Sequence, residues 1–578
     1  MIVDNKELSR VLSETADLME IAAEDGFRIR SYRNGATAIE GHPESVAVIL
    51  KDPSRKVTDI PGIGKGLAGV LAEIEATGSC ERRNALLQKY PPSALEFLKI
   101  QGLGPKSIAL LFEHFRITTM DELEQLCRDQ KLRDLPRMGA KLEEKVLRSI
   151  AQYRLRTGRF LLSFAQQTAD ELIAHLSGDG IESIIPAGSL RRGRETVGDL
   201  DLLVTGPNAT TAFDRMNSFP KVHEVLASGV NKVSVKLGRE GLQVDVRALP
   251  RESFGAAMQY FTGSKEHNVS IRQRAVRMGL KLSEYGLYRV EDESKVAGVT
   301  EEEVYQTLGL AWIPPEMREN LGEIELAAEN RLPPIVQLDQ IRGDLHMHTT
   351  ETDGRATLEE MAEAARQLSY QYIAITDHSK SLAMANGLDE QRVSAFAARI
   401  RQLNAGGDLG IRIFSGIECD IMRDGAMDLA WDALAELDFV IGSVHNNMNM
   451  EPAEMTDRLL RALECPSLRV FGHLTGRLLL NRDPYPFDFD RIVDEAVKRG
   501  VMFEINSSPE RLDLSANMAR SARSKGARFV INTDAHHPRH LFNMRYGVAT
   551  ARRAWLSPSD VLNTLPVDEF AARIAHAA

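Results

Sequence analysis

The stretch Ile341-Arg-Gly-Asp-Leu-His-Met-His348 is a short β-rich run that ends on two histidines. Six further runs of this kind follow, each ending on a polar or metal-binding side chain, at 372–378, 412–418, 439–445, 470–473, 501–506 and 529–536. Helix-length segments separate them, and this alternation predicts the parallel strands of a β/α barrel. Because such barrels carry their chemistry at the carboxyl ends of the strands, we expect one site at that rim.

Nine side chains of metal-ligand type lie at or just beyond these run ends. In a His-x-His pair on one strand, both imidazoles point to the same side. Histidines together with carboxylates suit Zn²⁺ or Mn²⁺ better than Mg²⁺. A single histidine is usually a satisfied core residue, but nine residues in this order favour a multinuclear metal hydrolase with up to three ions. They are His346, His348, Asp353, His378, Glu418, His445, His473, Asp534 and His536. Arg477 and Glu504 are further candidates that either contact substrate or brace the rim.

A second acidic motif lies upstream, in the stretch from Gly188 to Thr205. Asp199 and Asp201 alternate on a predicted strand, so their carboxylates share one face, and Asp245 is expected beside them on a neighbouring strand. Carboxylates with substrate phosphates are the usual ligands of Mg²⁺, and two such ions are expected here. The Gly188–Ser189 turn at a helix start would cradle phosphate, with added charge from Arg192. An isolated Asp-x-Asp pair can also be a surface turn.

Residues 1 to about 160 have helical periodicity, and three related turns recur within them. Ile60–Gly64, Ile100–Gly104 and Leu135–Gly139 each precede a lysine and a helical segment. Such turns expose backbone N–H groups that can hold a DNA phosphate without reading sequence. The alternative is a plain helix–helix turn, but the repetition favours DNA binding. The predicted contacts are Gly62, Gly64, Lys65, Gly102, Gly104 and Lys106.

Composition sets further bounds on the class of protein. The chain has 578 residues, enough for several domains, and its net charge of −11 does not by itself indicate a nucleic-acid binder. Four scattered cysteines without CxxC spacing predict a reducing compartment. The charged N-terminus is unlike a signal peptide, and every apolar stretch is too short for a membrane span. A soluble, cytoplasmic protein is expected, and a monomer, because no coiled-coil pattern is seen.

Three stretches resemble family X DNA polymerases of the nucleotidyltransferase superfamily: GSLRRGRETVGDLDLLV (188–204), VDVR (244–247) and YFTGSKEHN (260–268). The helical turns resemble the same family's amino-terminal domains, and the C-terminal half resembles the PHP (polymerase and histidinol phosphatase) domain. The combination is similar to bacterial family X polymerases with 3′–5′ exonuclease activity. The resemblance covers nearly the whole chain.

The resemblance implies a role for each matched residue. Asp199, Asp201 and Asp245 would be the catalytic metal ligands. The nucleotide would be bound by Arg159, Gly188, Ser189, Arg192, Tyr260, Phe261, Gly263, Asn268 and Arg272. Tyr260 and Phe261 could instead be core aromatics at a strand end. In the barrel, one ion would take His346, His348, Glu418 and Asp534, a second Glu418, His445 and His473, and a third Asp353, His378 and His536.

The expected fold class is multidomain α/β, with a helical helix-hairpin-helix region, a nucleotidyltransferase palm with a mixed sheet and a (β/α)7 PHP barrel. The expected domains are 1–88 (lyase-like, helix-hairpin-helix), 89–155 (fingers-like), 156–250 (palm), 251–330 (thumb-like, nucleotide selection) and 337–572 (barrel).

The expected function is gap-filling synthesis in DNA repair from dNTPs on gapped or primed DNA. The barrel would trim 3′ ends, and the resemblance adds cleavage at abasic sites. Val70 stands where eukaryotic relatives carry a Schiff-base lysine, which puts a 5′-deoxyribose-phosphate lyase activity in doubt. Two alternatives stay open. One is a PHP phosphomonoesterase with a DNA-binding accessory domain, and the other is a non-catalytic DNA-binding scaffold.

Overall fold

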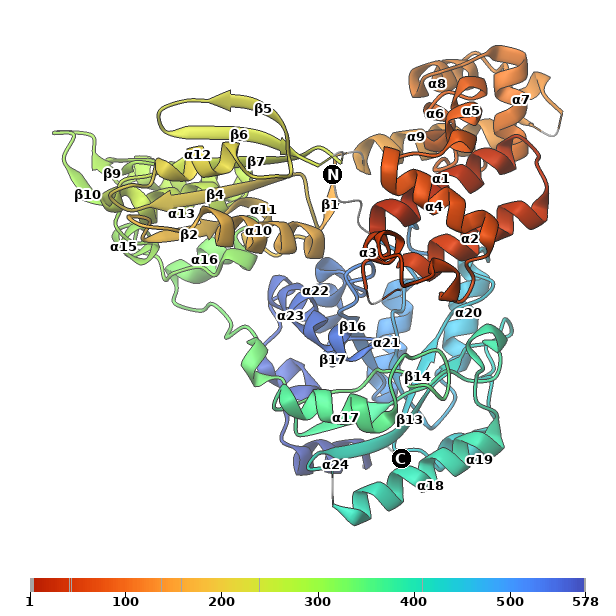
Figure 1. Cartoon of the computed structure of the whole chain (residues 1–578). Helices are drawn as coiled ribbons and strands as arrows, with labels where there is room; N and C mark the ends of the chain where they lie inside the picture. Colours follow the sequence, from red (N-terminus) through yellow and green to blue (C-terminus); the bar gives the residue numbers. More distant parts are fainter. Residues whose placement is uncertain are drawn as a thin grey trace. The chain divides into compact units, whose positions relative to one another are not determined.

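The computed structural model describes residues 5–575 except 41, 43, 137, 157, 239 and 408. They form two units, Met1–Thr157 and Gly158–Ala578. The first unit is drawn as helices in Figure 1, in red to orange. Its α-helices are α1 (Asn5–Ile21), α2 (Gly26–Glu40), α3 (Val46–Lys51), α4 (Lys65–Thr77), α5 (Glu81–Lys89), α6 (Ser93–Phe97), α7 (Pro105–Phe115), α8 (Met120–Arg128) and α9 (Ala140–Arg156). One apolar core runs through this unit, from Leu8 to Ile150.

The three predicted turns of the first unit share one backbone hydrogen bond. In the first, the N–H of Ile63 donates to the carbonyl of Ile60 at 3.1 Å, and the second and third turns repeat this bond at 3.1 and 3.2 Å. Gly62 and Gly102 have φ values of +92° and +101°, which other residues rarely adopt. Helices α4, α7 and α9 follow directly. Arg137, in the third turn, lies outside the described residues.

The second unit begins with the palm, whose five-stranded sheet has the order β2-β4-β7-β6-β5. Strand β4 runs parallel to β7, and β5 and β6 form the long yellow hairpin in Figure 1. The sheet strands are β2 (Ser183–Pro186), β4 (Asp199–Thr205), β5 (Val222–Ser228), β6 (Lys232–Leu237) and β7 (Leu242–Ala248). The small pair β1 (Phe160–Leu161) and β3 (Thr196–Val197) and the helices α10 (Leu162–Leu176), α11 (Gly188–Arg191) and α12 (Thr211–Asn217) complete this part.

The thumb follows the palm and combines helices with a three-stranded antiparallel sheet of order β10-β9-β8. Its elements are α13 (Phe254–Thr262), α14 (Lys265–Arg277), β8 (Leu280–Ser283), β9 (Gly286–Arg289), β10 (Lys295–Ala297), α15 (Glu301–Thr307) and α16 (Glu323–Ala328). Tyr260 and Phe261 lie in the last turn of α13 and not at a strand end, and Phe261 packs against a small core that includes Leu203 and Met258.

Seven parallel strands in sequential order form the C-terminal barrel, and a bridge between Met347 and Ala535 joins its first and last segments. The strands are β11 (Gly343–Asp344), β12 (Tyr372–Ile375), β13 (Arg412–Asp420), β14 (Phe439–Ser443), β15 (Leu468–Phe471), β16 (Met502–Asn506) and β17 (Phe529–Asn532). The helices are α17 (Leu358–Gln367), α18 (Glu390–Gly406), α19 (Trp431–Ala435), α20 (Pro452–Ala462), α21 (Phe489–Arg499), α22 (Ala516–Ser524), α23 (Met544–Arg553) and α24 (Val567–Ala575). The predicted fold class is confirmed.

Candidate active sites

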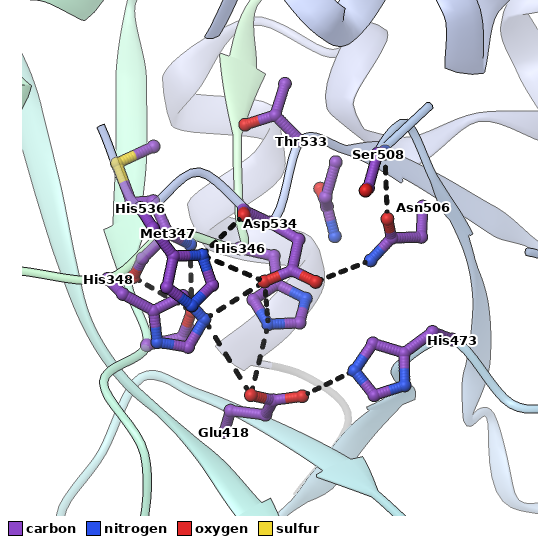
Figure 2. Close-up of polar contacts among 12 residues, drawn as sticks. His346, Met347, His348, Glu418, His473, Asn506, Ser508, Thr533, Asp534 and His536 are labelled. Carbon is purple, nitrogen blue, oxygen red and sulfur yellow. Dashed lines mark hydrogen bonds and ion pairs between the residues drawn. The ribbon is translucent and has the colours of Figure 1, made fainter. Parts of the chain in front are cut away.

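The carboxyl ends of the barrel strands bring the nine ligand-type residues together. Glu418 lies within β13, and the other eight follow the ends of their strands. Glu418 is at the centre of the group and is almost fully buried. Figure 2 shows its carboxylate facing His346, His348 and His473. Its distances to ring nitrogens are 2.9 Å (His378 and His473), 3.3 Å (His445), 3.5 Å (His346) and 3.7 Å (His348).

Two aspartates extend this group. The Asp534 carboxylate lies 3.2 Å from Nε2 of His348 and 3.6 Å from Nε2 of His346. The Asp353 carboxylate lies 3.5 Å from Nε2 of both His378 and His536. Potential ligand atoms within 4.8 Å of one another form three groups: His346, His348 and Asp534; His378, Glu418 and His445; and His348, Asp353, His378 and His536.

Unpaired buried nitrogens test whether these residues fit a metal. Nε2 of His346 and Nδ1 of His378 are buried and face the Glu418 carboxylate, and neither has a hydrogen-bond partner within the described part of the chain. A buried polar atom without a partner costs about 1–3 kcal/mol. Divalent cations would satisfy these atoms and the adjacent carboxylates, so the donor set fits metal ions of the zinc or manganese type.

Charge within the group shifts its pKa values strongly. Burial lowers the pKa of His378, but the carboxylates of Glu418 and Asp353 outweigh burial and raise that pKa to about 10. The same balance, with Glu418 and Asp420, raises the pKa of His445 to about 9. The pKa of Glu418 is held well below its usual value by the surrounding histidines, although burial opposes this. Bound cations would replace these imidazole protons, so binding at neutral pH would release protons.

A shell of carboxylates and amides orients the ligands. Glu504 accepts a hydrogen bond from Nδ1 of His346 at 2.7 Å. The sequence left two roles open for Glu504, substrate contact or bracing of the rim, and this bond supports the second. Asp420 bonds Nδ1 of His445 at 2.5 Å. The Asn506 amide donates to Asp534 at 3.1 Å (Figure 2). Asp420 was missed from the sequence, although its place two residues after Glu418 on one strand puts both on the same face.

We expect Asp420→Asn to weaken metal binding about 10- to 100-fold, because outer carboxylates orient the ligand imidazole and raise its basicity. The measurement is a competition titration against a chelator of known affinity. Asp438→Asn is the matched control, since Asp438 precedes β14 and bonds Ser415 at 2.8 Å at the opposite end of the strand pair. Equal metal affinity in Asp420→Asn and the unsubstituted protein would contradict this role.

Two arginines lie beside the rim. The guanidinium of Arg477 pairs with Glu195 of the palm at 2.8 Å, so this candidate braces the junction of palm and barrel. Nε of Arg511 lies 3.8 Å from the Asp534 carboxylate and brings positive charge to the rim. The sequence carried no spacing signal for Arg511, because it lies in the loop after β16.

The three palm aspartates lie on neighbouring parallel strands. Asp201 is in register with Asp245, and Asp199 with Gln243. Gly188 approaches this site closely, with φ +60°, and a Cβ there would lie only 2.8 Å from Oδ2 of Asp201. Any larger residue would therefore collide with the carboxylate. The backbone N–H of Ala187 donates to the carbonyl of Asp201 at 2.8 Å and fixes the helix α11 against β4.

The palm carboxylates differ in their electrostatics. Burial, followed by the charges of Asp199 and Asp245, raises the pKa of Asp201 to about 7. Burial opposes ionisation of Asp245 too, but its hydrogen bonds to Lys232 and Ser234 lower its pKa overall. Nζ of Lys232 lies 2.6 Å from Asp245 and was not singled out from the sequence. Crowded carboxylates of this kind are typical of a cation site.

Several of the predicted nucleotide-binding residues have protein partners. Nε of Arg159 donates to Thr196 at 2.9 Å. Arg192 donates to Glu319 at 3.0 Å and to the Thr262 carbonyl at 2.7 Å. Ser189 lies in α11, directly after Gly188.

The turn after α13 is held by one buried amide. The Asn268 side chain donates to the carbonyls of Tyr260 at 2.6 Å and Gly263 at 3.2 Å. A Cβ at Gly263 would lie 2.4 Å from the Asn268 side-chain oxygen, so this position excludes any larger residue. The Arg272 guanidinium lies 6.0 Å from the Tyr260 ring, and that of Arg247 lies 4.6 Å from the Phe261 ring.

The predicted DNA contacts lie on the surface of the first unit. Gly62, Gly64 and Lys65 are exposed, as is Lys106, while Gly104 is half-buried. Gly64 and Gly104 are the residues immediately before α4 and α7. The first backbone N–H groups of a helix lack intrahelical acceptors, so they are available to an anion.

Four family models match the chain: a helix-hairpin-helix domain at residues 3–80, a SAM-like helix-hairpin-helix tandem at 94–152, the DNA polymerase beta thumb at 257–319 and the PHP domain at 344–508. Fold and sites together define the class of family X DNA polymerases joined to a PHP domain. The chain belongs to the PolX family within it, since it is 37% identical over 569 residues to the DNA polymerase/3′-5′ exonuclease PolX of Bacillus subtilis strain 168, with 98% of each chain covered.

Two further relatives match part of the chain. DNA polymerase lambda of Arabidopsis thaliana is 23% identical over 346 residues, which cover 54% of this chain and 62% of that protein. A crystal structure of Leishmania infantum polymerase beta in a ternary P/T complex aligns with 39% of this chain and 98% of that chain, at 23% identity and a TM-score of 0.27. Among the described residues, every helix is too short or too polar to cross a bilayer.

Proposed function

We propose that this protein fills short gaps in DNA during repair and trims 3′ ends with a second, separate active site. The observation that carries the proposal is the presence of two distinct cation-type clusters in one chain of the PolX family. One consists of oxygen ligands in register on β4 and β7, and the other is dominated by imidazoles at the barrel rim. Both kinds of cluster suit reactions at phosphorus.

In the palm, Asp199, Asp201 and Asp245 would hold two Mg²⁺ ions. Such ions supply charge that activates the primer 3′-hydroxyl and stabilises the leaving pyrophosphate. The α11 turn at Gly188 and Ser189 would receive the phosphates, with Arg159 and Arg192 neutralising their charge.

The thumb residues would select the nucleotide. The turn at Tyr260, Phe261 and Gly263, held by Asn268, would crowd the sugar and exclude a ribose 2′-hydroxyl. Arg272 would reach the nascent base pair.

In the barrel, the nine rim residues would hold up to three Zn²⁺ or Mn²⁺ ions, in the grouping that the PHP resemblance implies. When bound, these ions supply Lewis-acid charge and an activated water for attack on a phosphodiester. Glu504, Asp420 and Asn506 keep the ligands oriented, and Arg511 is available to a phosphate oxygen. The reaction would remove nucleotides from a 3′ end, with cleavage at abasic sites as a further activity.

We propose that the chain is organised into domains 1–88, 89–155, 156–250, 251–330 and 337–572. We also propose that the protein is monomeric and cytoplasmic. Val70 lies in α4 and cannot form an imine, so we propose that this chain lacks the Schiff-base lyase activity of eukaryotic relatives.

We expect the double variant Lys65→Ala/Lys106→Ala to bind gapped duplex DNA more weakly and to lower the slope of log K against log salt by about two, because each phosphate contact contributes about 0.9 to that slope. Fluorescence anisotropy at several salt concentrations measures it. Lys51→Ala is the control, since Lys51 is paired with Glu75 at 2.6 Å. A double variant with an unchanged slope would exclude contact at these hairpins.

One experiment tests the proposed function as a whole. A 5′-labelled primer on gapped duplex is incubated with Mg²⁺ or Mn²⁺, with and without dNTPs, so that extension and shortening are read from the same gel. Extension with dNTPs and shortening without them are expected. Absence of incorporation, with release of phosphate from small monoesters, would favour the alternative of a PHP phosphomonoesterase with a DNA-binding accessory domain.

A further inference from the structure

Side chains of the barrel complete the apolar cores of both palm and thumb. Leu512 and Tyr546 are fully or almost fully buried in the palm core, in one hydrophobic cluster with Leu162 and Leu200. Trp555 is buried in the thumb core. Tyr546 lies in α23, and Trp555 lies two residues after its end. The barrel therefore packs directly against the palm and the thumb within the second unit.

The same helix supports the segment that follows Ser189. Gly193 has φ +63°, and a Cβ there would lie 3.1 Å from the Cβ of Ala549 in α23. Nη1 of Arg553, the last residue of α23, donates to the carbonyl of Arg192 at 3.0 Å. The backbone of the predicted triphosphate-binding segment is thus held from the barrel side.

Three guanidinium groups share one carboxylate at this junction. Glu319 of the thumb lies 3.0 Å from Arg192, 3.0 Å from Arg553 and 3.5 Å from Arg194. The side chains of Glu319, Arg192 and Arg553 are only 12, 13 and 10% exposed. Three positive charges against one negative charge leave an excess of two, which is typical of a site prepared for an anion.

We infer that Arg553 is a positioning residue of the polymerase site, supplied by the barrel. It holds the Arg192 backbone and keeps Glu319 paired when the Arg192 side chain turns to a nucleoside triphosphate. Leaving a nearly buried carboxylate without a partner costs free energy. Without Arg553, the Arg192 guanidinium therefore stays bound to Glu319 and is not available to the triphosphate. This inference rests on the proposed polymerase function and extends it, because it makes a barrel residue part of nucleotide binding.

The neighbouring arginine provides a matched control. Arg552 lies in the same helix and at the same junction, and pairs with Glu316 at 2.6 and 3.1 Å. It also donates to the Val336 carbonyl at 3.1 Å. Replacing Arg552 removes a partly buried ion pair between barrel and thumb while leaving the contacts of Glu319 with Arg192 in place.

The experiment is single-nucleotide incorporation by the full chain on gapped duplex, with kcat and KM for dNTP measured separately. Arg553→Ala is expected to raise KM about tenfold with little change in kcat, because it removes the charge-assisted bond to Glu319 and the bond to the Arg192 carbonyl. Arg553→Lys is expected to restore part of the loss, and Arg552→Ala to leave KM within about twofold of the unsubstituted protein. Glu319→Gln in the Arg553→Ala background is expected to lower KM again, since it releases Arg192.

Shortening of the same primer without dNTPs is measured in parallel and should be equal in all variants. The hydrogen bonds of Arg553 go to Glu319 and to the Arg192 carbonyl, and neither is one of the nine rim residues. An unchanged KM in Arg553→Ala, or an equal rise in Arg552→Ala, would overturn the inference in favour of general docking. If the unsubstituted protein incorporates no nucleotide, the proposed function itself fails, which is a separate result.

Discussion

Asp201→Asn is expected to abolish nucleotide incorporation, with a loss of about a thousandfold or more, because in the proposed function this carboxylate would hold the cations that stabilise the transition state. Asp201 is two residues from Asp199 on its own strand and in register with Asp245 on the next, so it is the central carboxylate of the three that would hold the ions. Asparagine keeps the size of the side chain and removes the charge. Extension of the 5′-labelled primer measures the loss.

Stability provides the control for folding in this variant. The pKa of Asp201 is about 7 in the folded protein, against 3.8 for an ordinary aspartate. The folded state therefore retains a proton that the unfolded chain has lost, so this group lowers stability as pH rises from about 4 to 7. Asparagine has no proton to lose. With a chelator present, Asp201→Asn should melt at a higher temperature than the unsubstituted protein, and by more at pH 8 than at pH 5.

The activity pattern decides whether the sites are independent. Asp201→Asn should shorten the primer in the absence of dNTPs as fast as the unsubstituted protein does. A variant that melts normally, yet loses both extension and shortening, would show that the two clusters do not act separately.

The second large effect is expected at the barrel. Glu418→Gln should reduce 3′-end shortening by about a thousandfold or more and lower the bound metal content, because one carboxylate faces five imidazoles and a neutral amide cannot balance bound cations. His348→Ala should have the same effect, since its ring faces both Glu418 and Asp534. Gel analysis of the labelled primer and elemental analysis after dialysis measure the two outcomes.

Extension with dNTPs is the internal control for the barrel variants. Glu418→Gln and His348→Ala should extend the primer normally, because the palm aspartates lie on a different sheet. Full shortening activity in Glu418→Gln would remove the barrel rim as the site of hydrolysis. Loss of extension together with a lowered melting temperature would instead indicate that the variant no longer folds.

Local sequence patterns were sufficient to predict the fold class and to identify the residues of metal-ligand type. Short runs with helical spacers predicted seven parallel strands, and β11 to β17 are confirmed. Alternation along a strand predicted that Asp199 and Asp201 share a face, because side-chain direction has a period of two residues. The metal-binding and nucleotide-binding roles of these residues remain predictions.

The partners of those residues followed only from the tertiary structure. Glu504 bonds His346 across 158 positions, and Arg477 bonds Glu195 across 282. Arg553 reaches Arg192 across 361 positions.

The sequence alone therefore determined which elements form and which side chains end the strands, since helix and strand periodicity depend on near neighbours. The tertiary structure decided which charges are paired and which barrel residue supports the palm. It also decided which buried imidazole nitrogens lack a hydrogen-bond partner among the described residues. Those outcomes depend on distances between segments far apart in the chain, and no spacing in the sequence encodes such distances.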